Sequence, residues 1–156
     1  MKVHLIAIGT KMPAWVTTAF EEYQKRLPEY FALQLHELPM ERRDGRASVQ
    51  KLMEKEGQLI LKALPKRAYV ICLDEHGKEM TSVQLAKRVE FLQSQGCDAA
   101  IIIGGPDGLA PEIKALAQEM WALSKLTLPH PLVRVILAET LYRAWSISAG
   151  LPYHRA

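Results

Sequence analysis

The sequence is poor in cysteine, since only two of its 156 residues, Cys72 and Cys97, are cysteines. They lie far apart, outside any C-x-x-C pair, and Cys72 sits within an apolar run. Disulfide frameworks and zinc sites need more such residues at closer spacing. The five histidines show no ligand spacing with cysteines or carboxylates either. We therefore expect structural thiols and no metal site.

The chain also lacks a long hydrophobic run. No window approaches the roughly 18 uninterrupted apolar residues of a membrane span, and the opening Met1–His4 shows no secretory signal pattern. With 49% hydrophobic and 24% charged residues, the composition suits one compact α/β domain over residues 1–156. We expect a soluble, cytoplasmic protein without a membrane partner.

Several catalytic motifs are missing as well. No G-x-S-x-G occurs, and neither cysteine neighbours an obvious base. Glycines 104, 105 and 108 are spaced G-G-x-x-G, and the acidic residue of a dinucleotide-binding fingerprint is absent. No Gly-Lys-Ser/Thr follows them. These absences argue against a serine or cysteine hydrolase, a dinucleotide-dependent oxidoreductase and a P-loop nucleotide hydrolase.

The net charge of +3 is too small to establish nucleic-acid binding by itself. The distribution of the basic residues is more informative, because they recur beside predicted loops and helix ends, where phosphates could be contacted. Each cluster alone fits an ordinary solvated face equally well. The clusters are Lys25–Arg26, then Arg42, Arg43, Arg46 and Lys51, then Lys66–Arg67, and finally Arg143, His154 and Arg155.

What the chain does contain is a regular alternation of strand and helix patterns. Strands are predicted over residues 2–8, 31–38, 68–73, 99–103 and 120–124. Helices are predicted from Pro13, over 48–64, 81–95 and 111–119, and from Pro131 to Gly150, with a loop at 39–46 and a turn at 74–78. This order predicts an α/β fold with a mainly parallel sheet and helices on both faces.

Ligands of such sheets bind outside the carboxyl ends of the strands. That rule selects Leu73–Asp74, Gly104–Gly105 and residues 124–128. The glycines permit close approach of the backbone to a ligand, and we expect a Cβ at Gly105 to meet that ligand, although a purely structural turn is an alternative. The stiff apolar segment Leu126–Pro131 suits either a pocket wall or a buried connection.

The last helix and the tail carry three further expectations. Glu139 and Arg143 can pair one turn apart, and the helix has a wide apolar stripe that we interpret as a dimer contact. The tail Tyr153–Arg155 should be frayed by default. Yet an aromatic ring, an imidazole and a guanidinium together also suit base stacking and phosphate binding. The stripe consists of Leu132, Val133, Ile136, Leu137, Leu141, Ala144 and Trp145.

The same regions carry a family resemblance. The chain resembles the SPOUT-class methyltransferases that modify pseudouridine in bacterial large-subunit ribosomal RNA. The stretches that carry it are Ala7–Lys11, Ile103–Leu109, Leu123–Arg134, Glu139–Trp145 and Pro152–Arg155. Because these stretches and the total length fit together, the resemblance spans the whole chain.

The resemblance implies a deep trefoil knot in the C-terminal region, a homodimer and bound S-adenosyl-L-methionine. It implies methylation of N3 of a pseudouridine in helix 69 of 23S ribosomal RNA, on the assembled ribosome and without a metal. The cofactor-binding residues that it implies are Leu73, Gly105, Leu123, Ser124, Lys125, Leu126, Thr127 and Leu128.

The resemblance also suggests a role for the tail. Tyr153, His154 and Arg155 would act on the RNA side, with His154 as proton acceptor or relay and Arg155 steadying the anion or a phosphate. One subunit would hold the cofactor, while its partner contributes the tail and the basic 42–46 region. The alternative is a non-catalytic ribosome-binding module of the same fold, against which the intact glycine turn and tail argue.

Overall fold

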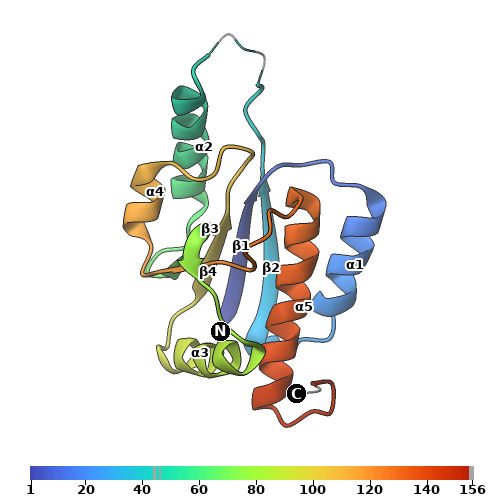
Figure 1. Ribbon diagram of the computed structural model, residues 1–156. Coiled ribbons are helices and arrows are strands. Elements are labelled where there is room, and N and C mark those ends of the chain that lie inside the picture. Colours follow the sequence, from blue (N-terminus) through green and yellow to red (C-terminus); the bar gives the residue numbers. More distant parts are fainter. Residues whose placement is uncertain (44, 46, 155–156) are drawn as a thin grey trace.

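Five strands form one sheet at the centre of the protein, in the order β2-β1-β4-β3-β5 (Figure 1). The computed structural model describes residues 1–43, 45 and 47–154. The strands are β1 (Lys2–Ile8), β2 (Ala32–Leu38), β3 (Tyr69–Lys78), β4 (Ala99–Ile103) and β5 (Glu119–Trp121). Every pairing between neighbouring strands is parallel. The predicted parallel α/β fold is confirmed.

Helices cover both faces of this sheet. They are α1 (Ala14–Gln24), α2 (Val49–Ala63), α3 (Ser82–Ser94), α4 (Pro111–Leu116) and α5 (His130–Ser148). Because side chains alternate along a strand, Leu5 and Ile101 point to the face covered by α1, α3 and α5. Their neighbours Ile6 and Ile102 point to the face covered by α2 and α4. Two apolar clusters therefore enclose the sheet, and all five residues of β4 are buried.

The helices begin where the local signals predict. Thr81 and Gln84 form the predicted capping box, with the Gln84 N–H donating to the Thr81 hydroxyl at 3.1 Å and the Thr81 N–H to the Gln84 amide oxygen at 2.9 Å. Ser48 caps α2 by accepting from the Lys51 N–H, and Pro131 stands in the first turn of α5. These contacts satisfy amide groups that a helix start leaves without partners.

Strand β3 is longer than predicted, because the segment expected to turn at 74–78 continues the strand to Lys78. The pairing of β3 with β5 shifts register here, so that both Leu73 and Lys78 lie opposite Trp121. Gly77 makes this arrangement possible, since a Cβ there would lie 2.6 Å from the carbonyl carbon of Trp121. The helix predicted at 111–119 is shorter than expected and ends at Leu116, since β5 begins at Glu119.

Helix α5 lies between α1 and α3 on the sheet (Figure 1). This position accounts for much of its broad apolar stripe, because Leu137, Leu141 and Ala144 are buried in the core of the same chain. Leu132 and Ile136 are only half-buried. The dimer contact and the knot stay predictions. Among the described helices, none combines the length and the apolar character that a membrane crossing requires.

Candidate functional site

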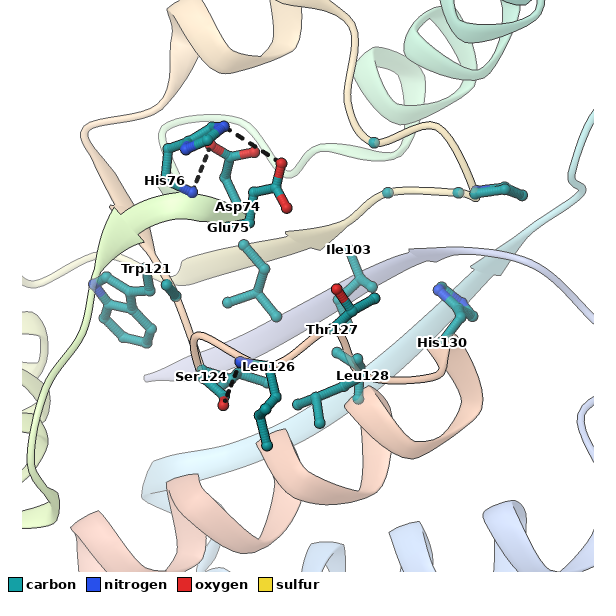
Figure 2. A pocket seen from close by; sticks show the side chains of 18 of the residues that line it. Asp74, Glu75, His76, Ile103, Trp121, Ser124, Leu126, Thr127, Leu128 and His130 are labelled. Atoms are coloured by element: carbon teal, nitrogen blue, oxygen red, sulfur yellow. Dashed lines mark hydrogen bonds and ion pairs between the residues drawn. The ribbon is translucent and has the colours of Figure 1, made fainter.

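A pocket of about 520 Å³ opens at the carboxyl end of β4, beside the second half of β3 and the segment that follows β5 (Figure 2). This volume lies within the range of about 300–1,000 Å³ that small-molecule sites occupy. The strand ends selected from topology meet here. All eight predicted cofactor-binding residues line the pocket, namely Leu73, Gly105, Leu123, Ser124, Lys125, Leu126, Thr127 and Leu128. What they bind stays a prediction, but the fold brings the whole set together.

The glycine turn at residues 104–108 forms one edge of the pocket. The Gly108 N–H donates to the Gly105 carbonyl at 3.1 Å, and Gly108 alone of the three glycines has a positive φ, of 83°. A Cβ at Gly104 would lie 2.8 Å from the carbonyl carbon of Gly108. A Cβ at Gly105 would lie 3.2 Å from both a Glu56 carboxylate oxygen and Ile8. The expectation that this Cβ would meet a ligand is therefore wrong, because the protein itself lies there.

Behind the turn, a buried carboxylate ties it to the basic segment. Glu56, only 1% exposed, accepts hydrogen bonds from the Glu41 N–H and from the Arg43 guanidinium, at 2.6 Å from Nη1. The Arg43 Nε donates to Asp107 of the glycine turn at 3.1 Å. The hydrogen bond to Glu56, followed by that to Asp107, raises the pKa of Arg43 against the effect of burial. Arg43 is thus engaged inside the protein.

This pairing divides the basic cluster that was predicted to meet RNA. Arg42 is exposed, whereas Arg43 is held by Glu56 and Asp107. Arg46 lies outside the described residues. Of the two described arginines, only Arg42 exposes its side chain to solvent. Arg43 instead forms ion pairs within the protein.

The segment after β5 forms the opposite wall of the pocket. Ser124 accepts a hydrogen bond from the Leu126 N–H at 3.0 Å, which closes a tight local turn (Figure 2). Leu126 exposes 75% of its surface. Of the two interpretations of this apolar segment, a pocket wall and a buried connection, the exposure of Leu126 favours the wall.

The rim of the pocket carries charges of both signs. Asp74 lies 3.4 Å from the Lys114 ammonium and accepts a hydrogen bond from the His76 N–H. The His76 imidazole lies 3.3 Å from Glu75. Figure 2 shows Asp74, Glu75 and His76 on one side of the pocket and the apolar Ile103 and Leu128 on another. A ligand with an apolar ring and charged ends would meet both kinds of surface here.

His130, at the start of α5, lines the pocket and is held by Arg134 one turn later. The Arg134 Nη2 lies 3.3 Å from His130 Nε2 and donates to the Gly9 carbonyl at 2.7 Å, while Nη1 donates to Glu37. Burial, and then the Arg134 charge, lower the pKa of His130, which a hydrogen bond to the Gly104 backbone partly offsets. A neutral imidazole follows, as expected of a structural hydrogen-bonding group.

Within the described part of the tail, Tyr153 is docked on α5 and is not frayed. The Tyr153 hydroxyl donates to Glu139 at 3.0 Å, and the Arg143 guanidinium, which pairs with Glu139 as predicted, lies 4.9 Å from the Tyr153 ring centroid. Burial and the Glu139 carboxylate raise the pKa of Tyr153 to about 12. His154 is half-buried, and its Nδ1 has no hydrogen-bond partner among the described residues. Arg155 lies outside the described residues.

The described part of the tail does not reach the pocket of its own chain, since neither Tyr153 nor His154 lines it. The tail follows the last residue of the 19-residue helix α5 and folds back on it, so that Tyr153 bonds to Glu139, about 9 Å along the axis beyond Val133 at 1.5 Å per residue. The pocket touches the first turn, at His130 and Val133. The described tail follows the far end of this helix (Figure 1). The two halves of the predicted site are therefore separated within one chain.

The parallel sheet and the pocket at its strand ends define an α/β protein with a small-molecule site, and comparison with known proteins identifies its family. The family model described as predicted SPOUT methyltransferase matches residues 1–154. The chain therefore belongs to the SPOUT methyltransferase family, whose members generally use S-adenosylmethionine as methyl donor.

A solved structure shows the same fold. It is described as the structure of a probable methylase family protein from Haemophilus influenzae Rd KW20. The match has a TM-score of 0.57 at 12% sequence identity and covers 99% of this chain and 70% of that chain. At this identity the likeness shows the fold alone.

Proposed function

We propose that this protein transfers a methyl group from S-adenosylmethionine to N3 of a pseudouridine in helix 69 of 23S ribosomal RNA, on the assembled ribosome. The observation that carries the donor half is the convergence of all eight expected cofactor residues on one pocket. Membership of the SPOUT methyltransferase family supports the methyl transfer. The RNA target rests on the resemblance of the terminal stretches of the sequence.

The pocket suits S-adenosylmethionine in size and chemistry. Leu73, Ile103 and Leu128 offer an apolar surface for a purine ring, and the glycine turn brings backbone amides and carbonyls to the edge. Asp74 and Lys114 place a carboxylate and an ammonium at the rim, where the charged ends of the molecule could pair. When bound, the cofactor supplies an electrophilic methyl group on a sulfonium.

The acceptor nitrogen needs help of a different kind. An imide nitrogen that titrates about two units above neutral costs roughly 2.7 kcal/mol to ionise at pH 7. His154 is our candidate proton acceptor or relay, and Arg155 our candidate for steadying the anion or a phosphate. Tyr153 keeps its proton, because its pKa is raised to about 12. We therefore assign the Tyr153 ring to stacking or hydrogen-bond donation.

We further propose that the working enzyme is a homodimer. The pocket and the tail lie at different parts of α5, so that a single chain does not join them. A partner chain could bring its tail and its exposed Arg42 to the pocket of the first chain. This arrangement would also enlarge the surface that a chain of 156 residues offers to the ribosome.

The activity is tested with ribosomes from a strain that lacks the enzyme. We expect label from S-adenosylmethionine to appear at a pseudouridine of helix 69. Transfer to another nucleotide would correct the target. Calorimetry with S-adenosylmethionine addresses the alternative, because a protein that binds ribosomes but no cofactor is a binding module.

The shared site is tested by mixing two inactive variants. One is truncated after Pro152 and keeps its pocket, and the other carries Gly104→Val, which distorts the glycine turn, and keeps its tail. If a tail acts on the partner's pocket, the mixed dimer contains one intact site and methyl transfer returns. If heterodimers are shown to form and the mixture still transfers no methyl group, the shared site is refuted.

A further inference from the structure

His130 is held on both sides of its ring. Its Nε2 lies 3.3 Å from the Arg134 Nη2, and a guanidinium only donates hydrogen bonds. The Nε2 atom must therefore act as the acceptor, which leaves the single proton of the neutral ring on Nδ1. On the pocket side, His130 lies with Gly104, the first glycine of the turn, in the same lining, and the Gly104 backbone partly offsets the lowering of the imidazole pKa, as a carbonyl that accepts from a ring N–H does.

Arg134 is itself immobilised, which makes this contact a fixed one. The side chain is 1% exposed, and its guanidinium donates to the Gly9 carbonyl after β1 and to Glu37 of β2. A glycine is favoured at position 9, where φ is 127° and a Cβ would lie 3.3 Å from the Arg134 Nη2. Two strand ends thus hold the arginine against His130.

Among the described residues around the pocket, no carboxylate is left unpaired to stabilise a protonated His130. The neighbouring elements carry charged groups that are paired already: Glu37 of β2 with Arg134, Asp107 of the glycine turn with Arg43, Asp74 of β3 with Lys114 of α4, and Glu75 with His76. The remaining charged group of the lining is Lys125, a second cation. A cation close to an imidazole disfavours its protonated form.

We propose that His130 and Arg134 are positioning residues of the cofactor pocket: Arg134 occupies Nε2, so that the neutral imidazole donates from Nδ1 to the backbone of Gly104. This inference rests on the proposed function, because it takes the pocket to be the cofactor site. The glycine turn is then held at both ends, by His130 at Gly104 and by Arg43 at Asp107. His130 does not exchange a proton with the substrate.

The role of the imidazole is tested by calorimetric titration with S-adenosylhomocysteine. We expect His130→Leu to weaken binding about tenfold or more, because the turn loses its anchor. His130→Asn should return the affinity to within about threefold of the wild type, since the asparagine amide can donate from nearly the position of Nδ1. His36→Leu is the matched control, because it removes another half-buried histidine, on β2 and outside the pocket.

The role of the arginine is tested through pH. Affinity of the wild type should vary by less than about twofold between about pH 6.5 and 8, because the lowered pKa keeps His130 neutral in this range. In Arg134→Met, the Nε2 atom becomes free to bind a proton and the opposing charge is gone, so His130 should take up a proton at a higher pH than in the wild type, as nitrogen-15 NMR would show. A purely structural arginine would lower the stability without shifting this protonation.

One measurement needs neither a variant nor a ligand. Nitrogen-15 NMR of the labelled histidines should show the Nδ1–H tautomer of His130 across the same pH range. An Nε2–H tautomer, or titration of His130 in the wild type, would overturn the proposal. Equal weakening by His130→Leu and His36→Leu would overturn the positioning role alone. Failure of the folded wild type to bind the cofactor or its product would instead refute the proposed function, together with the assignment of this pocket.

Discussion

The two ends of helix α5 differ in how completely one chain builds them. At the first turn, His130 and the buried Arg134 are fixed by β1, β2 and the glycine turn, and the pocket has its full set of walls. Farther along, Tyr153 rests on Glu139 at the surface, and the half-buried His154 has an Nδ1 without a partner among the described residues. The comparison shows that one chain holds the pocket end in place through buried contacts, and it agrees with our proposal that the acceptor half of the site is completed by a partner chain.

The largest expected difference between the two ends should appear when the tail is removed. Truncation after Pro152 should lower single-turnover methyl transfer to ribosomes by about 10²–10⁴-fold, the usual cost of losing an acid–base group. Affinity for S-adenosylmethionine should stay nearly unchanged, because Tyr153 and His154 do not line the pocket. A rate within about threefold of the full-length enzyme would show a passive tail, since acid–base loss costs far more.

The pocket end can be disturbed selectively through neighbouring arginines. Arg43→Met removes the clamp on Asp107 and leaves the Glu56 carboxylate buried without its charged partner. We expect about tenfold weaker cofactor binding in calorimetry, as the turn loses its preorganised shape. Arg42→Met changes the charge equally but alters an exposed side chain. It should keep the cofactor affinity and weaken only ribosome binding, so equal effects of both variants on the cofactor would contradict the clamp.

A finer test separates the tyrosine ring from its hydroxyl. Because its pKa is raised to about 12, Tyr153 stays protonated throughout the working range and does not titrate with activity. Tyr153→Phe keeps the ring and loses one hydrogen bond, worth about 1 kcal/mol. The rate should fall by no more than about fivefold, with an unchanged pH profile. Loss of the alkaline limb of that profile in the variant would make Tyr153 the titrating group.

The smallest expected effect concerns the stability of the sheet and involves His36 of β2. It is a control for the pH profiles, because it shows how far the stability itself depends on pH. Burial, and then the neighbouring His4, lower the pKa of His36 from its usual 6.5. Below pH 6.5, His36 therefore binds a proton more readily in the unfolded chain than in the folded protein. The contribution of His36 to the free energy of unfolding is fully present above pH 6.5 and is lost as the pH falls. Thermal unfolding should show this decline.

The variant His36→Gln supplies the control for that decline. Its amide can replace the Nε2 atom in the hydrogen bond of 3.0 Å between His4 Nδ1 and His36 Nε2, so the loss of stability at neutral pH should stay below about 1 kcal/mol. The melting temperature of the variant should then depend less on pH between about 7 and 5.5. An identical pH dependence in both proteins would assign the decline to other groups.

Much of the fold could be predicted because its signals are local. The apolar run of β1, the capping box at Thr81 and the proline at the start of α5 each act within a few residues. The extension of β3 was missed, since Asp74–Lys78 is polar and its pairing with β5 depends on a strand far along the chain. Hydrophobic pattern alone does not encode such edge pairing.

The strand ends of the site were predicted from topology, but the groups that support them were not. Glu56 carries a signal that could have been used, because it follows Leu52 and precedes Ile60 by one turn each on the buried side of α2. Arg134 carries another, as a single charge within the apolar run Leu132–Leu137. The partners of Arg43 and Tyr153 depend on the tertiary fold and left no local trace.

Gly77 links the packing of β3 against β5 to the shape of the pocket wall. The backbone of β3 lies so close to Trp121 at Gly77 that a methyl group at this position would require β5 to move. The chain runs from Trp121 directly into Ala122 and Leu123 of the pocket wall. Substitution of Gly77 by alanine and then by larger residues should therefore shift this wall of the pocket stepwise, without changing any of the residues that line it.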